Sequence, residues 1–164
     1  MVLNFPVGDS VQQLMRLSDF RSDKVLELLH NKFSGYVVVT ISGITGIEEG
    51  LLFFLEGVVS GAAHTFDSSD SAVFGTHALE LFFNALAAEK GIVETYALSR
   101  QQVELILALE EKISAEEPKR GLSSLFVKSY SPELAQKLLP VQEASEELHK
   151  FEVLKKFGLS DLAK

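Results

Sequence analysis

A tight hairpin is the feature that most constrains what this chain can fold into. Two apolar runs, residues 51–55 and 58–63, are separated only by Glu56-Gly57. A two-residue connection between strands needs positive φ, which glycine adopts with no Cβ penalty. Gly57 therefore predicts a turn, and the chain is expected to contain an antiparallel sheet built around this hairpin.

Sequence patterns also predict the elements on either side of the hairpin. A β-branched and aromatic run predicts a strand at residues 36–41, followed by a loop at 42–49, and alternating polarity predicts a strand at 92–98. Apolar residues at helical spacing predict helices at residues 10–18, 22–33, 73–86 and 99–113. The expected class is α+β: a small, mostly antiparallel sheet around the hairpin, packed with helices and followed by a helical C-terminal segment.

A charged stretch with Pro118 and Gly121, residues 115–121, is typical of a linker. It predicts a first domain over residues 1–116 and a linker plus helical segment over 117–164. Within that segment, residues 122–130 are expected to be a strand or an extended connection. One helix is expected to begin at Ser131-Pro132-Glu133, and a last helix is expected over about residues 145–157.

The composition excludes several classes of function. The chain has 164 residues and a net charge of −8. Because it has no cysteine, thiolate chemistry, disulfides and zinc fingers are excluded. Because residues 1–99 hold 5 basic and 12 acidic side chains, nucleic acid and membrane surfaces are disfavoured as partners. No apolar stretch approaches the about 20 residues that span a bilayer, and no signal peptide is recognisable. A cytoplasmic location is expected.

Candidate catalytic and metal-binding residues are sparse. The histidines are dispersed, and the one singled out is His64, which lies near a cluster of carboxylates, those of Asp67 and Asp70. A metal site or a hydrolase built on these three residues competes with a solvated loop histidine beside helix-capping aspartates, which we favour. His77, on an apolar stripe, is expected to be packed and hydrogen-bonded. The glycines at residues 43–50 lack the lysine of a phosphate-binding loop. We therefore expect no catalytic, cofactor-binding or metal-binding residues.

The order of motifs in the middle of the chain resembles a known family. These motifs are Leu28-Leu29, Ser34-Gly35, residues 50–54, Glu56-Gly57-Val58-Val59, Ala62, Gly75, Ala78-Leu79, Phe82-Phe83 and Gly91-Ile92-Val93. Over residues 25–98 the sequence resembles the PATAN-type domain, an amino-terminal module of bacterial response regulators, and a related uncharacterised archaeal family. The resemblance implies signalling or assembly through protein contacts, with no catalytic residues. Phe74-Gly75-Thr76 departs from the small or polar turn that is usual there.

Phenylalanines and small residues suggest where contacts form. Either flanking helices cover both sheet faces and bury the rings between Phe53 and Phe83, or some rings form an exposed patch that a second subunit covers. The small residues 61–63 allow close packing of the chain's own helix at 73–86, or a binding groove. The expected interaction residues are Phe53, Glu56, Gly57, Gly61, Ala62, Phe74, Phe82 and Phe83.

These observations lead to an expected function. We expect a non-enzymatic regulatory or scaffold domain that acts through protein contacts, binds an unidentified protein partner and forms a homo-oligomer. The alternative is a sensor that holds a small apolar ligand between the Phe-rich sheet and its helix, with Gly61 and Ala62 providing the space.

Overall fold

The Glu56-Gly57 hairpin lies in the interior of a six-stranded antiparallel sheet with strand order β1-β6-β2-β3-β4-β5. This is a computed structural model, and it describes residues 5–140. The strands are β1 (Asp9–Arg16), β2 (Gly35–Ser42), β3 (Ile47–Leu55), β4 (Val58–Phe66), β5 (Ser71–Phe74) and β6 (Gly91–Ala97). The helices are α1 (Ser22–His30), α2 (Thr76–Leu86), α3 (Arg100–Leu109) and α4 (Pro132–Leu138), with short 3-10 turns that include η3 (Glu111–Ile113) and η4 (Leu122–Leu125). The α+β class is confirmed.

The predicted turn has the backbone that a tight hairpin needs. Both of its residues have positive φ, 49° at Glu56 and 79° at Gly57, and they join β3 to β4. The turn is also docked on the chain between α1 and β2. The Gly57 amide donates to the Phe33 carbonyl at 2.8 Å, and the Glu56 amide donates to Ser34 Oγ at 2.8 Å.

The strands predicted at residues 36–41 and 92–98 are confirmed as β2 and β6, which pair with each other. The predicted loop at 42–49 is shorter than expected, because β3 already begins at Ile47. The helix predicted at residues 99–113 is confirmed at its start but ends earlier, at Leu109, and residues 111–113 form the separate 3-10 turn η3. This helix is α3, and both hydrogen bonds of its Ser99–Gln102 capping box are present.

The helix predicted at residues 10–18 is wrong, because β1 occupies this segment and pairs with β6. The side chains of β1 are exposed except that of Met15, which is partly buried, and the buried Leu17 already belongs to the 3-10 turn η1 (Leu17–Asp19) that follows. The apolar spacing therefore marks no buried helical face. The open edge of β6 satisfies the backbone hydrogen bonds of the segment instead. This is a tertiary interaction that local propensity does not contain.

The helix predicted at 73–86 is also corrected at its start. Val73 and Phe74 belong to β5, which pairs with β4, and α2 begins only at Thr76. Gly75, with φ 69°, separates the strand from the helix. The exposed edge of β4 recruits the first residues of the predicted helix, as the edge of β6 recruits β1. Residues 122–125 form η4, a 3-10 turn, where a strand or extended connection was expected.

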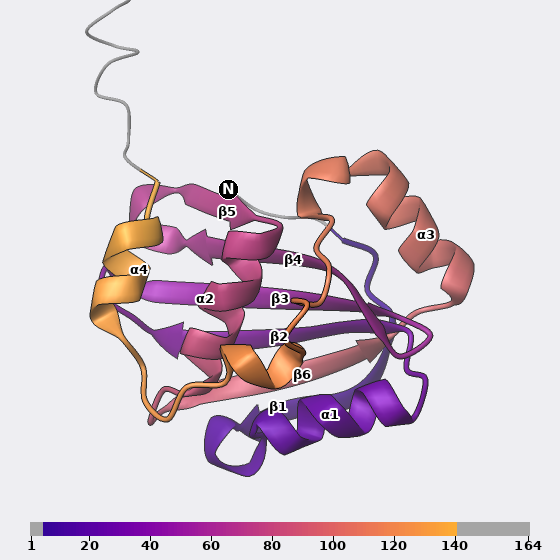
Figure 1. Cartoon of the computed structure of the whole chain (residues 1–164), viewed down its shortest axis with the longest axis horizontal. Helices are drawn as coiled ribbons and strands as arrows, with labels where there is room; N and C mark the ends of the chain where they lie inside the picture. The colour runs from indigo at the N-terminus through magenta and orange to yellow at the C-terminus, as the bar shows by residue number, and fades with distance from the viewer. Residues whose placement is uncertain (1–4, 141–164) are drawn as a thin grey trace, which may run out of the picture.

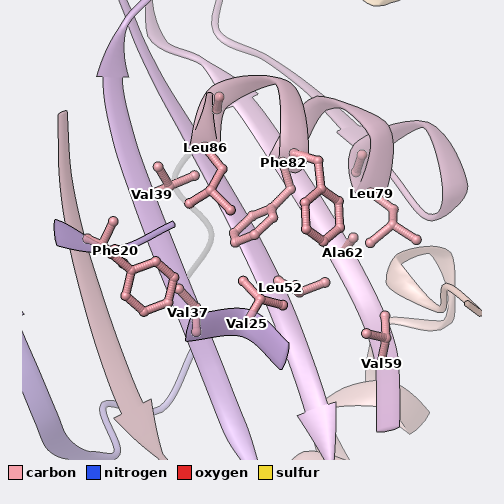
Figure 2. Packing of buried hydrophobic residues seen from close by; sticks show 14 of the residues in the cluster. Phe20, Val25, Val37, Val39, Leu52, Val59, Ala62, Leu79, Phe82 and Leu86 are labelled. Atoms are coloured by element: carbon pink, nitrogen blue, oxygen red, sulfur yellow. The ribbon is translucent and has the colours of Figure 1, made fainter. Parts of the chain in front are cut away.

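One face of the sheet carries the main core. In Figure 1, α2 lies across the strands with α4 next to it and α1 along one side. Figure 2 shows Leu79, Phe82 and Leu86 of α2 directed at the strand residues Leu52 and Ala62. Val25 of α1 and Leu122 of η4 belong to the same buried cluster. The side chain of Ala62 thus packs against α2, as one of the alternatives for residues 61–63 predicted.

The other face carries a second core beneath α3 and η3. Phe53 lies there with Val103 and Ile113, whereas its neighbour Phe54 lies in the α2 core. Phe53, Phe54, Phe66, Phe82 and Phe83 are each at most 1% exposed. Of the two alternatives for the rings, burial by elements on both faces is therefore confirmed, although Phe74 is only half-buried.

The segment predicted as a linker is in contact with the sheet. Ala115 is buried and its amide donates to the Ser60 carbonyl at 3.2 Å. The helix predicted at Ser131-Pro132-Glu133 is confirmed as α4, with Ser131 Oγ accepting from the Leu134 amide. The division at residue 116 stays a prediction, since contact does not test whether each part folds alone. The helix predicted at 145–157 lies outside the described residues.

Within residues 5–140, every helix is too short or too polar to cross a bilayer.

A Gly57→Ala substitution is expected to destabilise the domain by about 2 kcal/mol or more. The new Cβ would be strained by φ 79° and would collide with the Leu29 carbonyl oxygen. Gly121→Ala is the matched control, since φ there is 85° and the nearest atom to an added Cβ is 3.9 Å away. Urea unfolding of the full chain measures both. Equal losses would show that the docking of the turn on α1 contributes nothing.

Candidate functional site

A buried polar cluster lies beside the α2 core. The Glu48 side chain is 1% exposed and His64 is 0% exposed, and His64 Nε2 lies 3.1 Å from Glu48 Oε2. The Tyr130 hydroxyl donates to Glu48 Oε1 at 3.1 Å, and the Ile44 amide donates to the same oxygen at 3.0 Å. One carboxylate thus joins β3, β4, the loop before β3 and the chain before α4.

Two glycines make room for this cluster. Gly50 pairs with His64 across β3 and β4, and a Cβ at Gly50 would lie 3.2 Å from His64 Nδ1 and 3.2 Å from Phe82. A Cβ at Gly43 would overlap the Glu48 carboxyl group. Gly43 and Gly50 belong to the glycine-containing stretch that lacks the lysine of a phosphate-binding loop. In the fold, the absence of a Cβ at these two positions leaves room for a buried carboxylate and an imidazole.

The cluster combines acid–base groups that the described residues bury. Glu48 and His64 are enclosed, and burial together with the Glu48 charge and hydrogen bond raises the pKa of Tyr130 to about 12. Within the described part of the chain, His64 Nδ1 and Thr45 Oγ1 have no hydrogen-bond partner. We interpret the cluster as a structural tie, meaning a set of buried hydrogen bonds that holds separate segments together, because three segments of the chain donate to the Glu48 carboxylate.

The predictions for the histidines need correction. His64 was expected as a solvated loop residue, but it is a buried residue of β4, because Glu48 provides a partner that lies too far away in sequence to be recognised. Asp67 and Asp70 do not join it: both are exposed and line a groove to which His64 does not contribute. His77 was expected to be packed but is exposed on α2.

The groove lies on the α3 side of the sheet, in the area that α3 does not cover. It has a volume of about 600 Å³. Its floor is formed by side chains of β2, β3 and β6, with Thr65 of β4 at one side. The lining residues are Phe5, Val7, Tyr36, Val38, Ile47, Glu49, Leu51, Thr65, Phe66, Asp67, Asp70, Glu94 and Tyr96.

Apolar and aromatic groups alternate with carboxylates in this groove. Ile47 is 46% exposed there, and the Tyr36 and Tyr96 rings stack with centroids 5.1 Å apart. Burial raises the pKa of Tyr36, and so, to a lesser extent, do Tyr96 and the carboxylate of Glu94. Burial also raises the pKa of Tyr96, with Glu94 adding its charge and a hydrogen bond. Among the described residues that line the groove, none carries a positive charge.

A second hollow, of about 800 Å³, lies at the C-terminal end of α2. Its lining includes Arg21, Lys90 and Lys128 together with Glu89, so its charge is of the opposite sign to that of the groove. Tyr130 contributes to its wall. Tyr130 thus lines this hollow and also donates its hydroxyl to the buried Glu48.

The predicted interaction residues are not brought together on one surface. Five of them, Phe53, Gly61, Ala62, Phe82 and Phe83, are buried within the domain. Glu56 is exposed at the hairpin and pairs with Arg100 at 3.4 Å, whereas Gly57 is held against α1. Phe74 lies on β5 with the Lys112 ammonium 4.3 Å from its ring centroid. The groove residues themselves had no sequence signal beyond the acidic excess of residues 1–99.

Comparison with family models identifies one family. Residues 3–110 match the family described as "Uncharacterized protein conserved in archaea" (DUF2226). The chain belongs to this family. The predicted relation to an archaeal family is thus confirmed. No curated protein and no solved structure matches the chain. All residues that line the groove lie within the matched range, whereas Tyr130 lies beyond it.

Removing the buried carboxylate is expected to be costly. Glu48→Ala leaves the His64 ring, the Tyr130 hydroxyl and the Ile44 amide without their acceptor, and should lower the free energy of unfolding by about 3 kcal/mol or more. Glu49→Ala, one residue along and exposed on the opposite face, should change it by less than about 0.5 kcal/mol. Chemical denaturation measures both, and similar losses would contradict the structural tie.

The Tyr130 hydroxyl should make the free energy of unfolding depend on pH in the alkaline range. Its pKa is about 12 in the folded chain against an ordinary value of 10.0, so the folded state holds this proton more tightly. The stabilisation is present below pH 10 and is lost as the pH rises from 10 to about 12. The difference in unfolding free energy between the native chain and Tyr130→Phe should therefore shrink over that interval. A constant difference would contradict the bond to Glu48.

Proposed function

We propose that this domain is a non-enzymatic regulatory or scaffold module that binds protein through the groove on the α3 side of its sheet. One observation carries the proposal: the sheet face is only partly covered, and the uncovered part exposes Ile47 in a groove that the stacked rings of Tyr36 and Tyr96 also line. Exposed apolar surface that is rimmed by polar groups marks sites of protein interaction or ligand binding.

The position of the groove changes which surface is proposed. The hairpin and the helix after β5 were expected to make the contacts. The hairpin turn is held by Phe33 and Ser34, and α2 lies between the sheet and the segment that contains η4 and α4. An open, half-covered sheet face is a better docking surface than elements that already have partners in the chain.

The resemblance over residues 25–98 supports a role in signalling of the PATAN type, in the cytoplasm, with self-association of the domain as a further part of the proposal. The alternative, a sensor of a small apolar ligand, would use space beside Gly61 and Ala62. Beside Gly61 that space holds Leu107 at 3.0 Å and Ile113 at 3.1 Å from the position of a Cβ. The groove therefore supports the protein-binding role better.

The test compares partner capture by three immobilised full-length chains: the native chain, Ile47→Arg and Leu109→Arg. Ile47 is 46% exposed in the groove, and Leu109 is 74% exposed on α3 outside it. At least one protein from the source cell should bind the native chain and Leu109→Arg and bind Ile47→Arg about tenfold less, which is about 1.4 kcal/mol.

Denaturant midpoints of the two variants serve as the folding control for this comparison. If Ile47→Arg retains the same proteins as the native chain, the groove is not the docking surface.

A further inference from the structure

The groove has a charge pattern that selects its occupant. Carboxylates of Glu49, Asp67, Asp70 and Glu94 line it, and no Lys, Arg or His is among the described lining residues. An acidic or polyphosphate partner would be repelled, and a basic partner attracted, because complementary potentials steer association and penalise partners of like charge. The occupant is therefore a basic one.

The strand register places two of these carboxylates at a defined spacing. Glu94 of β6 lies opposite Val38 of β2, which lies opposite Leu51 of β3. Glu49 lies two residues before Leu51 on β3, and so on the same face. With strands about 4.8 Å apart and a rise of about 3.3 Å per residue, the Cα atoms of Glu49 and Glu94 are about 12 Å apart.

The floor beside the two carboxylates is apolar, and Thr40 of β2 lies opposite Glu49. Val38 and Leu51 form this floor, and both line the groove. Tyr96 follows Glu94 on the same face of β6, and its ring offers a surface for a cationic head group close to that carboxylate. A partner that fits must therefore present a positive group at each end and an apolar group in the middle.

An extended peptide has this spacing. Side chains at i, i+2 and i+4 of a strand point to one face, and i and i+4 are about 13 Å apart. Basic residues at i and i+4 would reach Glu49 and Glu94, while an apolar residue at i+2 would contact Val38 and Leu51. The aliphatic stems of Lys and Arg would add contact with Ile47 and the tyrosine rings.

We propose that the groove binds an extended segment of a partner protein with the pattern basic-x-apolar-x-basic. This rests on the proposed function, since it names the class of partner for the same groove. A short polycation such as spermidine carries the charges without the central apolar group. A second copy of the chain could offer the basic hollow of Arg21, Lys90 and Lys128. A protein segment is favoured because only it satisfies the apolar floor together with both carboxylates.

The experiment measures binding of fluorescent peptides to the full chain by anisotropy. The probe contains Arg-Thr-Leu-Thr-Arg. Controls of the same length contain Arg-Arg-Leu-Thr-Thr, which alters the spacing, and Glu-Thr-Leu-Thr-Glu, which reverses the charge. The probe should bind about tenfold more tightly than the respaced peptide, and the acidic peptide should not bind. Affinity for the probe should fall as salt concentration rises.

Variants locate the binding. Glu49→Gln and Glu94→Gln should each weaken binding of the probe about fivefold to tenfold, whereas Glu89→Gln, exposed and outside the groove, should not. The double variant Glu49→Lys, Glu94→Lys should lose the probe and gain the acidic peptide. Reversal of this kind cannot come from loss of folding, which would abolish both.

Several outcomes would overturn the proposal. These are equal binding of the respaced peptide, unchanged binding by Glu49→Gln and Glu94→Gln, or equal displacement of the probe by spermidine and by unlabelled peptide. Self-association in light scattering that Glu49→Gln abolishes would assign the groove to a second copy.

If Ile47→Arg still loses its cellular partner while the charge variants bind peptides normally, the protein-binding role stands and the basic pattern falls. If Ile47→Arg retains that partner, the proposed function itself falls.

Discussion

The double-sided apolar character of β3 is the constraint on which the rest of the structure depends. Successive side chains of a strand point to opposite faces, so Phe53 and Phe54 cannot be buried by one layer of helices. Leaving either ring in water would forgo about 2 kcal/mol of burial energy. The chain meets this requirement with α2, α1 and η4 over one face and with α3 and η3 over the other.

The two layers are unequal, and this inequality produces the groove. On the α2 side the elements that cover the sheet bury a carboxylate and an imidazole, those of Glu48 and His64. On the α3 side, one helix of ten residues and one 3-10 turn cover only the part of the sheet around Phe53. The remaining area keeps its apolar floor but lies at the surface, with acidic side chains among the apolar ones. The same constraint that organises the core thus leaves a site for recognition.

Glycines on the two faces of the sheet make room for different side chains. Gly61 admits Leu107 and Ile113 on the α3 side, whereas Gly50 leaves room for His64 and Phe82 on the α2 side. The polar cluster also extends the fold beyond α3, because Tyr130 reaches Glu48 and Asn84 exchanges two hydrogen bonds with the Ser131 backbone. The chain after residue 116 is attached by these specific bonds as well as by the burial of Leu122.

The sequence by itself determined the elements whose signals are local. The Gly57 turn, the capping box at Ser99 and the Ser131-Pro132 helix start depend on neighbours a few residues away, and each was predictable. Only the tertiary structure decided that residues 9–16 and 71–74 are strands, because their partners are edges of β6 and β4. Likewise, Glu48 and His64 are sixteen residues apart, and Glu49 and Glu94 share a face only through the register of three strands. Contacts of this kind are set by pairing and packing, which no short stretch of sequence encodes.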